Sequence, residues 1–265
     1  MNTDEKEQIL KAREYIVAKS NEIVQKSRYQ LSVQEQKTIA YICSMIKPQT
    51  AVERAKGHPF ILEYEFNIRD YCKICGIDYD SGKNYTDIKN VLKGLRDKSF
   101  WLKLEDGSET TISWVNKVWC NKGTGKAKIR LDEDMVPYLF DLQEKFVAYG
   151  LYNILAMKSQ YSIRIYELIK SYAYQKSKTF DINELKHLLM VDNVKSYVNF
   201  KDFRKYVLEV AQAEINELTD LMVTYEPITK GRKVVKVKFN IETKSIKGRN
   251  IAILRVENKL DKAIR

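Results

Sequence analysis

The sequence predicts an α+β protein built from two tandem winged-helix domains related by duplication. Two observations support this prediction: helices are followed by a β-hairpin, and that order returns in the second half of the 265 residues. At roughly 100–200 residues per domain, the chain has room for two domains. We expect an N-terminal winged-helix domain over 1–140, a C-terminal winged-helix domain over 141–242 and a basic tail over 243–265.

The first half begins with a polar, helix-prone stretch, and we expect a leading helix over 2–19. Ser32 and Glu35 form an S-x-x-E capping box ahead of apolar residues at helical spacing, and Pro48 ends that helix. A strand, two helices and three more strand-like runs follow, with turn residues between the last three. These elements are expected over 60–66, 67–77, 85–98, 100–105, 111–119 and 127–131.

The same order returns in the second half. Helices are expected over 162–174, 181–191 and 199–219, and strands over 221–227 and 233–242 flank the turn ITKGR. In the long third helix, helical spacing predicts an inward stripe of Phe203, Val207, Val210 and Leu218. A helix followed by a hairpin of this kind predicts a wing.

Two sequence blocks repeat at nearly the same offset. FNIRDY at 66–71 aligns with FDINEL at 180–185, and NYTDIK at 84–89 aligns with NFKDFR at 199–204. Each block is interpreted as a helix start, with N-cap candidates Asn67, Asp181, Asn84 and Asn199. Capping patterns recur in any helical protein, but the matching order and spacing favour duplication.

The formal net charge of +11 indicates duplex DNA as the partner, because a basic surface gains free energy by releasing the counterions condensed on DNA. A merely solvated basic surface is the alternative. We expect no membrane partner, since no segment pairs a basic face with a strong apolar face and no apolar run approaches ~20 residues. The polar start MNTDEKEQIL and four cysteines without a secretory signal predict a cytoplasmic protein.

The second helix of a helix-turn-helix lies in the major groove, where its first turns reach base edges. In the C-terminal domain that helix starts near Asn199, and we expect Arg204 to read bases while Lys201 and Lys205 read bases or hold phosphates. Residues before the helix and at the wing turn are expected to hold the DNA backbone: Lys195, Ser196 and Tyr197, then Lys230, Arg232 and Lys233. The alternative is that the wing cations only solubilise an edge hairpin.

The N-terminal domain offers a weaker set of DNA-contact candidates, namely Lys83, Asn84 and Lys89, with Lys93 nearby. Asp87 and Asp97 dilute the charge there. We leave open whether this domain contacts only phosphates or serves mainly as a protein interface.

The chain shows no pattern of a metal, cofactor or catalytic site. Cys72 and Cys75 form a C-x-x-C, but no second ligand pair accompanies it, and both cysteines continue the apolar pattern of Ile68 and Ile77. His58 and His187 stand alone, unlike the paired histidines that a nicking enzyme needs, and no phosphate-binding G-x-x-x-x-G-K-[ST] loop occurs. We therefore expect no cofactor and no enzymatic activity.

Three segments carry a family resemblance. The segments SNEIVQKSRYQLSVQEQKTIAYICSMI, SQYSIRIYELI and FKDFRKYVLEVAQAEINELTDLMVTYEPITKGRKVVKVKF resemble the Rep_3 (RepB/RepA-type) plasmid replication initiators. The similarity covers roughly residues 15–242, and EINELTD and TKGRKV are its most specific parts.

This resemblance implies a protein that binds tandem origin repeats (iterons) as a monomer, and that represses its own gene as a homodimer on an operator inverted repeat. It implies dimer contacts mainly through the N-terminal domain and recruitment of host initiator and helicase-loading proteins. It assigns base reading to 199–218, which supports Asn199, Lys201, Arg204, Lys205 and the wing at 230–233. A winged-helix transcriptional repressor without an initiator role is the alternative.

Overall fold

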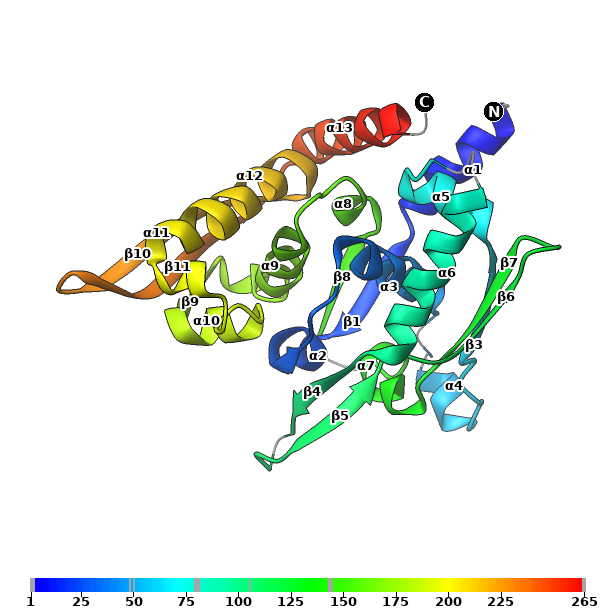
Figure 1. Ribbon diagram of the computed structural model, residues 1–265, viewed down its shortest axis with the longest axis horizontal. Coiled ribbons are helices and arrows are strands. Elements are labelled where there is room, and N and C mark those ends of the chain that lie inside the picture. The colour runs from blue at the N-terminus through cyan, green and yellow to red at the C-terminus, as the bar shows by residue number, and fades with distance from the viewer. Residues whose placement is uncertain are drawn as a thin grey trace.

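The computed structural model describes residues 3–47, 49, 51–78, 82–104, 106–142 and 145–263. In Figure 1 the N-terminal module (α1 to α7) and the C-terminal module (α8 to β11) lie side by side, with strands β1 and β8 between them and helix α13 along one edge. Strand β1 (Ile16–Ser20) pairs antiparallel with β8 (Phe146–Gly150), so residues from both halves build the joint. The domain boundary at 140/141 stays a prediction.

The N-terminal module begins with α1 (Thr3–Arg13), β1, α2 (Asn21–Lys26), β2 (Ser27–Arg28), α3 (Val33–Met45) and α4 (Ala51–Ala55). It continues with β3 (Glu63–Asn67), α5 (Ile68–Cys75), α6 (Gly82–Asp97), β4 (Ser99–Lys103), β5 (Glu109–Ser113), β6 (Val115–Asn121) and β7 (Lys126–Leu131). The 3-10 turn η1 (Glu133–Met135) and α7 (Val136–Leu139) end it. Its strands form two sheets, β2-β4-β5 and β3-β7-β6.

The C-terminal module contains α8 (Tyr152–Leu155), α9 (Gln160–Lys170), η2 (Ala173–Gln175), β9 (Ser177–Asp181), α10 (Ile182–Leu188) and η3 (Lys195–Val198). The long third helix is built from α11 (Phe200–Phe203), the π-helical turn η4 (Arg204–Leu208) and α12 (Glu209–Leu218). Strands β10 (Leu221–Lys230) and β11 (Lys233–Thr243) form the hairpin, and β11 also pairs with β9. Helix α13 (Ile246–Ala263) follows.

Both modules share one topology, in which a strand precedes the second helix and pairs with the far strand of the hairpin. Asn67 begins α5 by accepting hydrogen bonds from the backbone N–H groups of Arg69 and Asp70, and Asp181 begins α10 in the same manner. The residues before them, Phe66 and Phe180, are buried in the two cores. These matching contacts support the duplication, and the order of helices and hairpin is that of a winged helix.

Three details of the predicted helix starts and ends are settled by the backbone. The Ser32–Glu35 capping box is present, with both reciprocal hydrogen bonds made, whereas Pro48 lies outside the described residues. Asn199 caps α11 as expected. Asn84 does not cap α6, because that helix already begins at Gly82.

The leading helix predicted over 2–19 was wrong, because α1 ends at Arg13 and residues 16–20 form strand β1. The β-branched pair Ile16 and Val17 gains a partner strand from residues 146–150, and Val17 becomes fully buried there. A pairing partner this far along the chain outweighs the helix propensity of a polar segment.

The single strand predicted over 111–119 is divided at Trp114, and its two halves, β5 and β6, join different sheets. The indole is 1% exposed, and its ring lies 5.0 Å from the ring of Phe100 and 5.5 Å from that of Tyr29. Burying this large side chain fixes the bend. Trp114 is therefore a residue of the core.

The π-helical turn η4 changes the inward stripe of the long helix. Phe203, Val207 and Leu218 are buried as predicted, but Val210 is only half-buried, and Leu208 is fully buried in its place. Val207 and Leu208 are successive residues of this π-turn, and both face the core.

A buried polar network joins the two modules. Lys19 Nζ on β1 donates a 2.6 Å hydrogen bond to Glu167 Oε1 on α9, and Tyr149 and Tyr29 also donate to that carboxylate. Burial opposes ionisation of Glu167, but the charge and hydrogen bond of Lys19 outweigh it, so the pKa of Glu167 lies below its ordinary value of 4.5. Burial likewise works against the charge of Lys19, and Glu167 outweighs it, which raises the pKa of Lys19.

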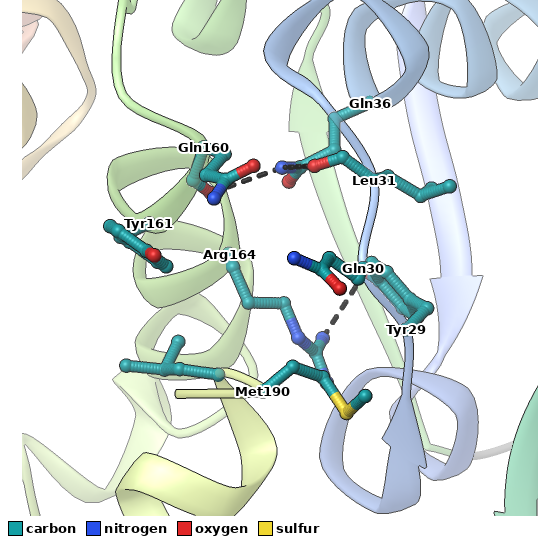
Figure 2. Close-up of a pocket in the computed structure, with 9 residues that line it drawn as sticks. Tyr29, Gln30, Leu31, Gln36, Gln160, Tyr161, Arg164 and Met190 are labelled. Carbon is teal, nitrogen blue, oxygen red and sulfur yellow. Dashed lines mark hydrogen bonds between the residues drawn. The ribbon is translucent and has the colours of Figure 1, made fainter. Parts of the chain in front are cut away.

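A small pocket beside this network shows how closely the modules meet (Figure 2). Gln36 Nε2 on α3 donates to the carbonyl oxygens of Leu31 and of Gln160 on α9. Arg164, which is 4% exposed, donates to the carbonyl oxygen of Ser27 at 2.8 Å and to the Tyr29 hydroxyl at 3.3 Å. A side chain of each module therefore satisfies a backbone carbonyl group of the other.

Cys72 and Cys75 are core residues, as the apolar pattern of their helix predicted. They are 0% and 3% exposed, and burial raises the pKa of each thiol to about 12. Cys43 is also buried, with a pKa raised to about 11 by burial, whereas Cys120 is half-buried.

Replacing Glu167 by Gln should lower the free energy of unfolding by about 3–5 kcal/mol at pH 7, because Lys19 would remain buried without its partner. The contribution of the Glu167 carboxylate is complete above its ordinary pKa of 4.5 and is lost as pH falls through the lowered native value. The difference between the two proteins should therefore shrink in acid. Urea unfolding across pH measures it. Glu65→Gln, which removes an exposed ion pair with Lys126, is the control and should cost less than about 1 kcal/mol.

The four cysteines should differ in their reaction with a thiol reagent such as DTNB. In the native protein Cys120 should react first, because Cys43, Cys72 and Cys75 are buried and their raised pKa values leave little thiolate. Peptide mapping of the labelled protein identifies the order. All four should react at similar rates in denaturant, and rapid native labelling of Cys72 would contradict their placement in the core.

Candidate nucleic-acid interface

The C-terminal module presents the long helix α11–η4–α12 along the hairpin β10–β11, and the hairpin tip extends beyond the start of α11 (Figure 1). Phe203, Val207 and Leu208 anchor the helix in the core and are fully buried. Lys201, Arg204 and Lys205 alternate with these anchors and are exposed. The structure therefore brings the three predicted cations together on the open side of the first helical turns.

Arg204 has a carboxylate partner on its own helix. Its Nε lies 3.2 Å from Glu209 Oε1, and both side chains are about half exposed, at 50% and 51%. An exposed ion pair of this kind contributes about 0–1 kcal/mol, so a guanine edge or a phosphate can replace Glu209 at little cost. Lys205 Nζ lies 5.1 Å from the centre of the exposed Tyr206 ring. This cation–π contact restricts the conformations of the Lys205 side chain.

The residues before the helix divide into exposed and packed side chains. Lys195 and Ser196 on η3 are exposed, whereas Tyr197 is half-buried, with its ring 6.2 Å from that of Phe203 and 6.1 Å from that of Tyr161. Tyr197 thus holds η3 against the start of the recognition helix. Asn199 Oδ1 accepts the Lys201 N–H at 3.0 Å, so this oxygen serves the helix start.

The wing carries its cations at the tip. Lys230 pairs with Lys233 across a two-residue turn of Gly231 and Arg232, and Gly231 adopts a φ of +62° that an L side chain rarely tolerates. Lys230, Arg232 and Lys233 are all exposed. The alternating strand pattern continues this positive edge to Lys236, which is exposed as well.

The N-terminal module has a basic groove between α6 and β6, with a volume of about 550 Å³. Four cations and one carboxylate line it, which gives a net charge of +3: Lys89, Lys93, Arg96 and Lys117 against Asp97. Hydrogen bonds from Lys93 and Arg96 keep the pKa of Asp97 below its ordinary value, so this carboxylate stays ionised and paired. Of the residues predicted in this module, Lys89 lies in the groove, while the side chains of Lys83 and Asn84 lie outside the described part of the structure.

Sequence reasoning missed Lys117 as a candidate contact. It was placed in a strand expected to run straight through Trp114, and only the bend there brings β6 alongside α6. The strand β6 (VNKVWCN) contains a single charged residue, Lys117, and its sequence does not indicate which helix that residue faces. Trp119 is half-buried, and the Nζ atoms of Lys117 and Lys128 lie 4.9 Å and 4.6 Å from its ring centre.

Across the described ranges, no group of three or more His, Cys, Asp or Glu side chains is placed to hold a metal ion. The two histidines are far apart in the chain, and the ring of His187 bonds Asp192 at 2.9 Å. Within those same ranges, no helix has the length and apolar character that crossing a bilayer requires.

Known proteins share both modules. The family model described as Initiator Replication protein, WH1, matches residues 16–170, and that described as Initiator Rep protein, WH2, matches residues 181–241. A replication initiation protein of Escherichia coli is 25% identical over 236 residues, covering 86% of this chain and 70% of that protein. The PI protein of Escherichia coli is 30% identical over 147 residues, covering 49% of this chain and 48% of that protein.

A solved structure has the same fold. The crystal structure of Pi initiator protein in complex with iteron DNA matches with a TM-score of 0.66 at 20% sequence identity, covering 88% of this chain and 99% of that one. Together with the two family models, this match confirms the predicted α+β fold of two tandem winged-helix domains.

Proposed function

The chain belongs to the Rep_3 family of initiator replication proteins, and from this membership we propose that it is a plasmid replication initiator that binds origin iterons in duplex DNA sequence-specifically. The observation that carries the proposal is the exposure of cations both on the first turns of a helix and at the tip of its adjoining hairpin in the C-terminal module. That arrangement suits a major groove and its flanking phosphates.

In the proposed complex the start of the long helix lies in the major groove, with Arg204 exchanging Glu209 for the O6 and N7 acceptors of a guanine. Lys201 and Lys205 contact neighbouring bases or phosphates, as do Lys195, Ser196 and Asn199 at the helix start. The ring of Tyr197 packs on Phe203 and so supports the start of the helix, while its exposed part contacts the DNA backbone. The wing residues Lys230, Arg232 and Lys233 hold the DNA backbone.

The N-terminal module holds a second stretch of the same DNA through its basic groove, to which Lys89 and Lys117 contribute. Two modules on one DNA face place their helices in successive major grooves about 10 bp apart, so the bound site is about two turns long. Lys83 and Asn84 remain candidates for this contact.

Initiation in this proposal needs no catalytic step by the chain. Several bound copies bend and strain an adjacent A·T-rich segment, and exposed protein faces recruit host initiator and helicase-loading proteins. A homodimer formed through the N-terminal domain represses the protein's own gene on an inverted repeat, and the protein acts in the cytoplasm. A DNA-nicking activity would contradict this, and would appear as relaxed circles when supercoiled plasmid is incubated with the protein and Mg²⁺.

A plasmid assay separates an initiator from a transcriptional repressor with the same fold. The gene, supplied in trans, should allow replication of a plasmid that carries its flanking repeats but lacks an initiator gene. Gel-shift binding to those repeats should exceed binding to random duplex by at least about 10³-fold. Binding without replication would favour the repressor, and equal binding to random duplex would defeat both functions.

Arg204→Ala and Lys233→Ala should weaken DNA binding in different ways. The Arg204 change should cost about 1–3 kcal/mol on the cognate site and reduce discrimination at one base position. The Lys233 change should weaken all duplexes alike, because a wing lysine contacts phosphate. Affinities for a set of single-base site variants measure both effects. The opposite pattern would mean that Lys233 reads a base and Arg204 contacts phosphate.

Lys117→Ala should lower affinity for cognate and random duplexes by a similar factor and reduce the slope of log K against log salt by about 1. The reason is that the groove cation contacts phosphate alone. Lys103→Ala is the matched control, since Lys103 is an exposed strand lysine of the same module on the other sheet. An unchanged salt slope in Lys117→Ala would place the groove away from the DNA.

A further inference from the structure

Helix α13 (Ile246–Ala263) lies outside both matched regions, which end at residue 241. It leaves the C-terminal module after β11 and runs along one edge of the molecule until its end lies beside α1 and α5 of the N-terminal module (Figure 1). From the sequence we expected no role for this segment beyond that of a basic tail. In the structure, however, α13 contacts both modules, and these contacts indicate a role in holding them together.

Along most of its length, up to Lys259, α13 is attached to the C-terminal module. It packs on α8 and α12, and its residues Ala252 and Val256 are 1% and 0% exposed. Lys259 Nζ lies 2.7 Å from Glu217 Oε2 on α12. Just before α13, Lys244 Nζ donates to the carbonyl oxygens of Asn216 and Thr219, at 2.6 Å and 2.8 Å, where the recognition helix ends.

At its last turns α13 is attached to the N-terminal module. Leu260 is 4% exposed and lies directly over Gly76, where an added Cβ would sit 2.5 Å from Leu260 Cδ2 and 3.2 Å from its Cα. Asp261 Oδ1 lies 3.8 Å from an Arg13 guanidinium nitrogen. Arg13 itself donates to the carbonyl oxygens of Lys73 and Ile74, both at 3.0 Å, so Asp261 is joined to the group that holds the end of α5.

We propose that α13 is a strap that fixes the angle between the two DNA-contacting modules and so determines which spacing of their DNA half-sites is bound. The central joint consists of β1–β8, the Lys19–Glu167 pair and the contacts of α9, and all of these lie in one region between the modules. A second attachment at the edge resists rotation of one module against the other, because it acts at a distance from the joint. The claim that α13 selects the half-site spacing rests on the proposed function, whereas the claim that it fixes the angle between the modules does not.

Leu260→Lys tests the strap, since it puts a charge into the contact with Gly76. Leu254→Lys is the matched control on the same helix, because Leu254 is 58% exposed. Spin labels on cysteines placed at the exposed positions Asn90 on α6 and Ala213 on α12, in a Cys120→Ser background, report the distance between modules by pulsed electron resonance in the full chain without DNA.

The parent and Leu254→Lys should give one narrow distance distribution, and Leu260→Lys a distribution at least about twofold wider. A narrow distribution in Leu260→Lys would overturn the strap, whatever the protein binds. Leu260→Ala removes the contact without adding a charge, so it decides the question if the lysine variant does not fold. An unchanged width in Leu260→Ala would then overturn the proposal.

The DNA readout uses a duplex selected from random sequence by the intact chain, and the same duplex with about half a turn, roughly 5 bp, inserted between the segments that the two modules protect. The insertion should weaken the parent and Leu254→Lys at least about 10-fold, but Leu260→Lys less than about 3-fold. Equal penalties in all three would overturn the spacing role. If selection yields no preferred sequence, the proposed function fails, and the distance measurement still judges the strap.

Discussion

The arrangement of this molecule depends on the buried ion pair between Lys19 and Glu167. An ammonium group and a carboxylate cannot stay charged in a protein interior unless they lie close together and their remaining hydrogen-bonding capacity is used. Tyr149 and Tyr29 complete the carboxylate's shell. Because Lys19 lies on β1 and Glu167 on α9, this requirement fixes the register of β1 against β8 and places α9, on which the recognition helix packs, relative to the N-terminal module.

The recognition surface shows how a local irregularity serves a site. The π-turn lies within the long helix, and its successive residues Val207 and Leu208 are both fully buried. The turn contains Arg204 and Lys205 and so sets the direction in which these side chains leave the helix. The hairpin adds cations at its tip, where Gly231 supplies the backbone conformation that a two-residue turn requires.

Those parts of the fold that short-range chemistry determines could be predicted from sequence. Capping by Ser32, Asn67 and Asp181 and the turn at Gly231 depend on neighbours a few residues away, as does the exposure of Lys201 and Arg204 on the helix. Strand β1, the bend at Trp114 and the π-turn depend on partners distant in the chain, and local propensity does not report them. The N-terminal groove was missed for that reason, and so was the role of 246–263, because neither exists until the modules meet.

The pairing of Arg204 with Glu209 has a kinetic consequence for a protein that must find few sites among many. On random duplex the guanidinium gains one phosphate and loses one carboxylate, an exchange between similar anions with little net free energy. A guanine edge offers two acceptors in a plane, which a single carboxylate contact does not match. In the proposed complex the loss of Glu209 weakens binding to target and random duplex by the same factor. It therefore shortens the dwell on random DNA, which speeds the search, while the second acceptor of the guanine edge prolongs the dwell at the target.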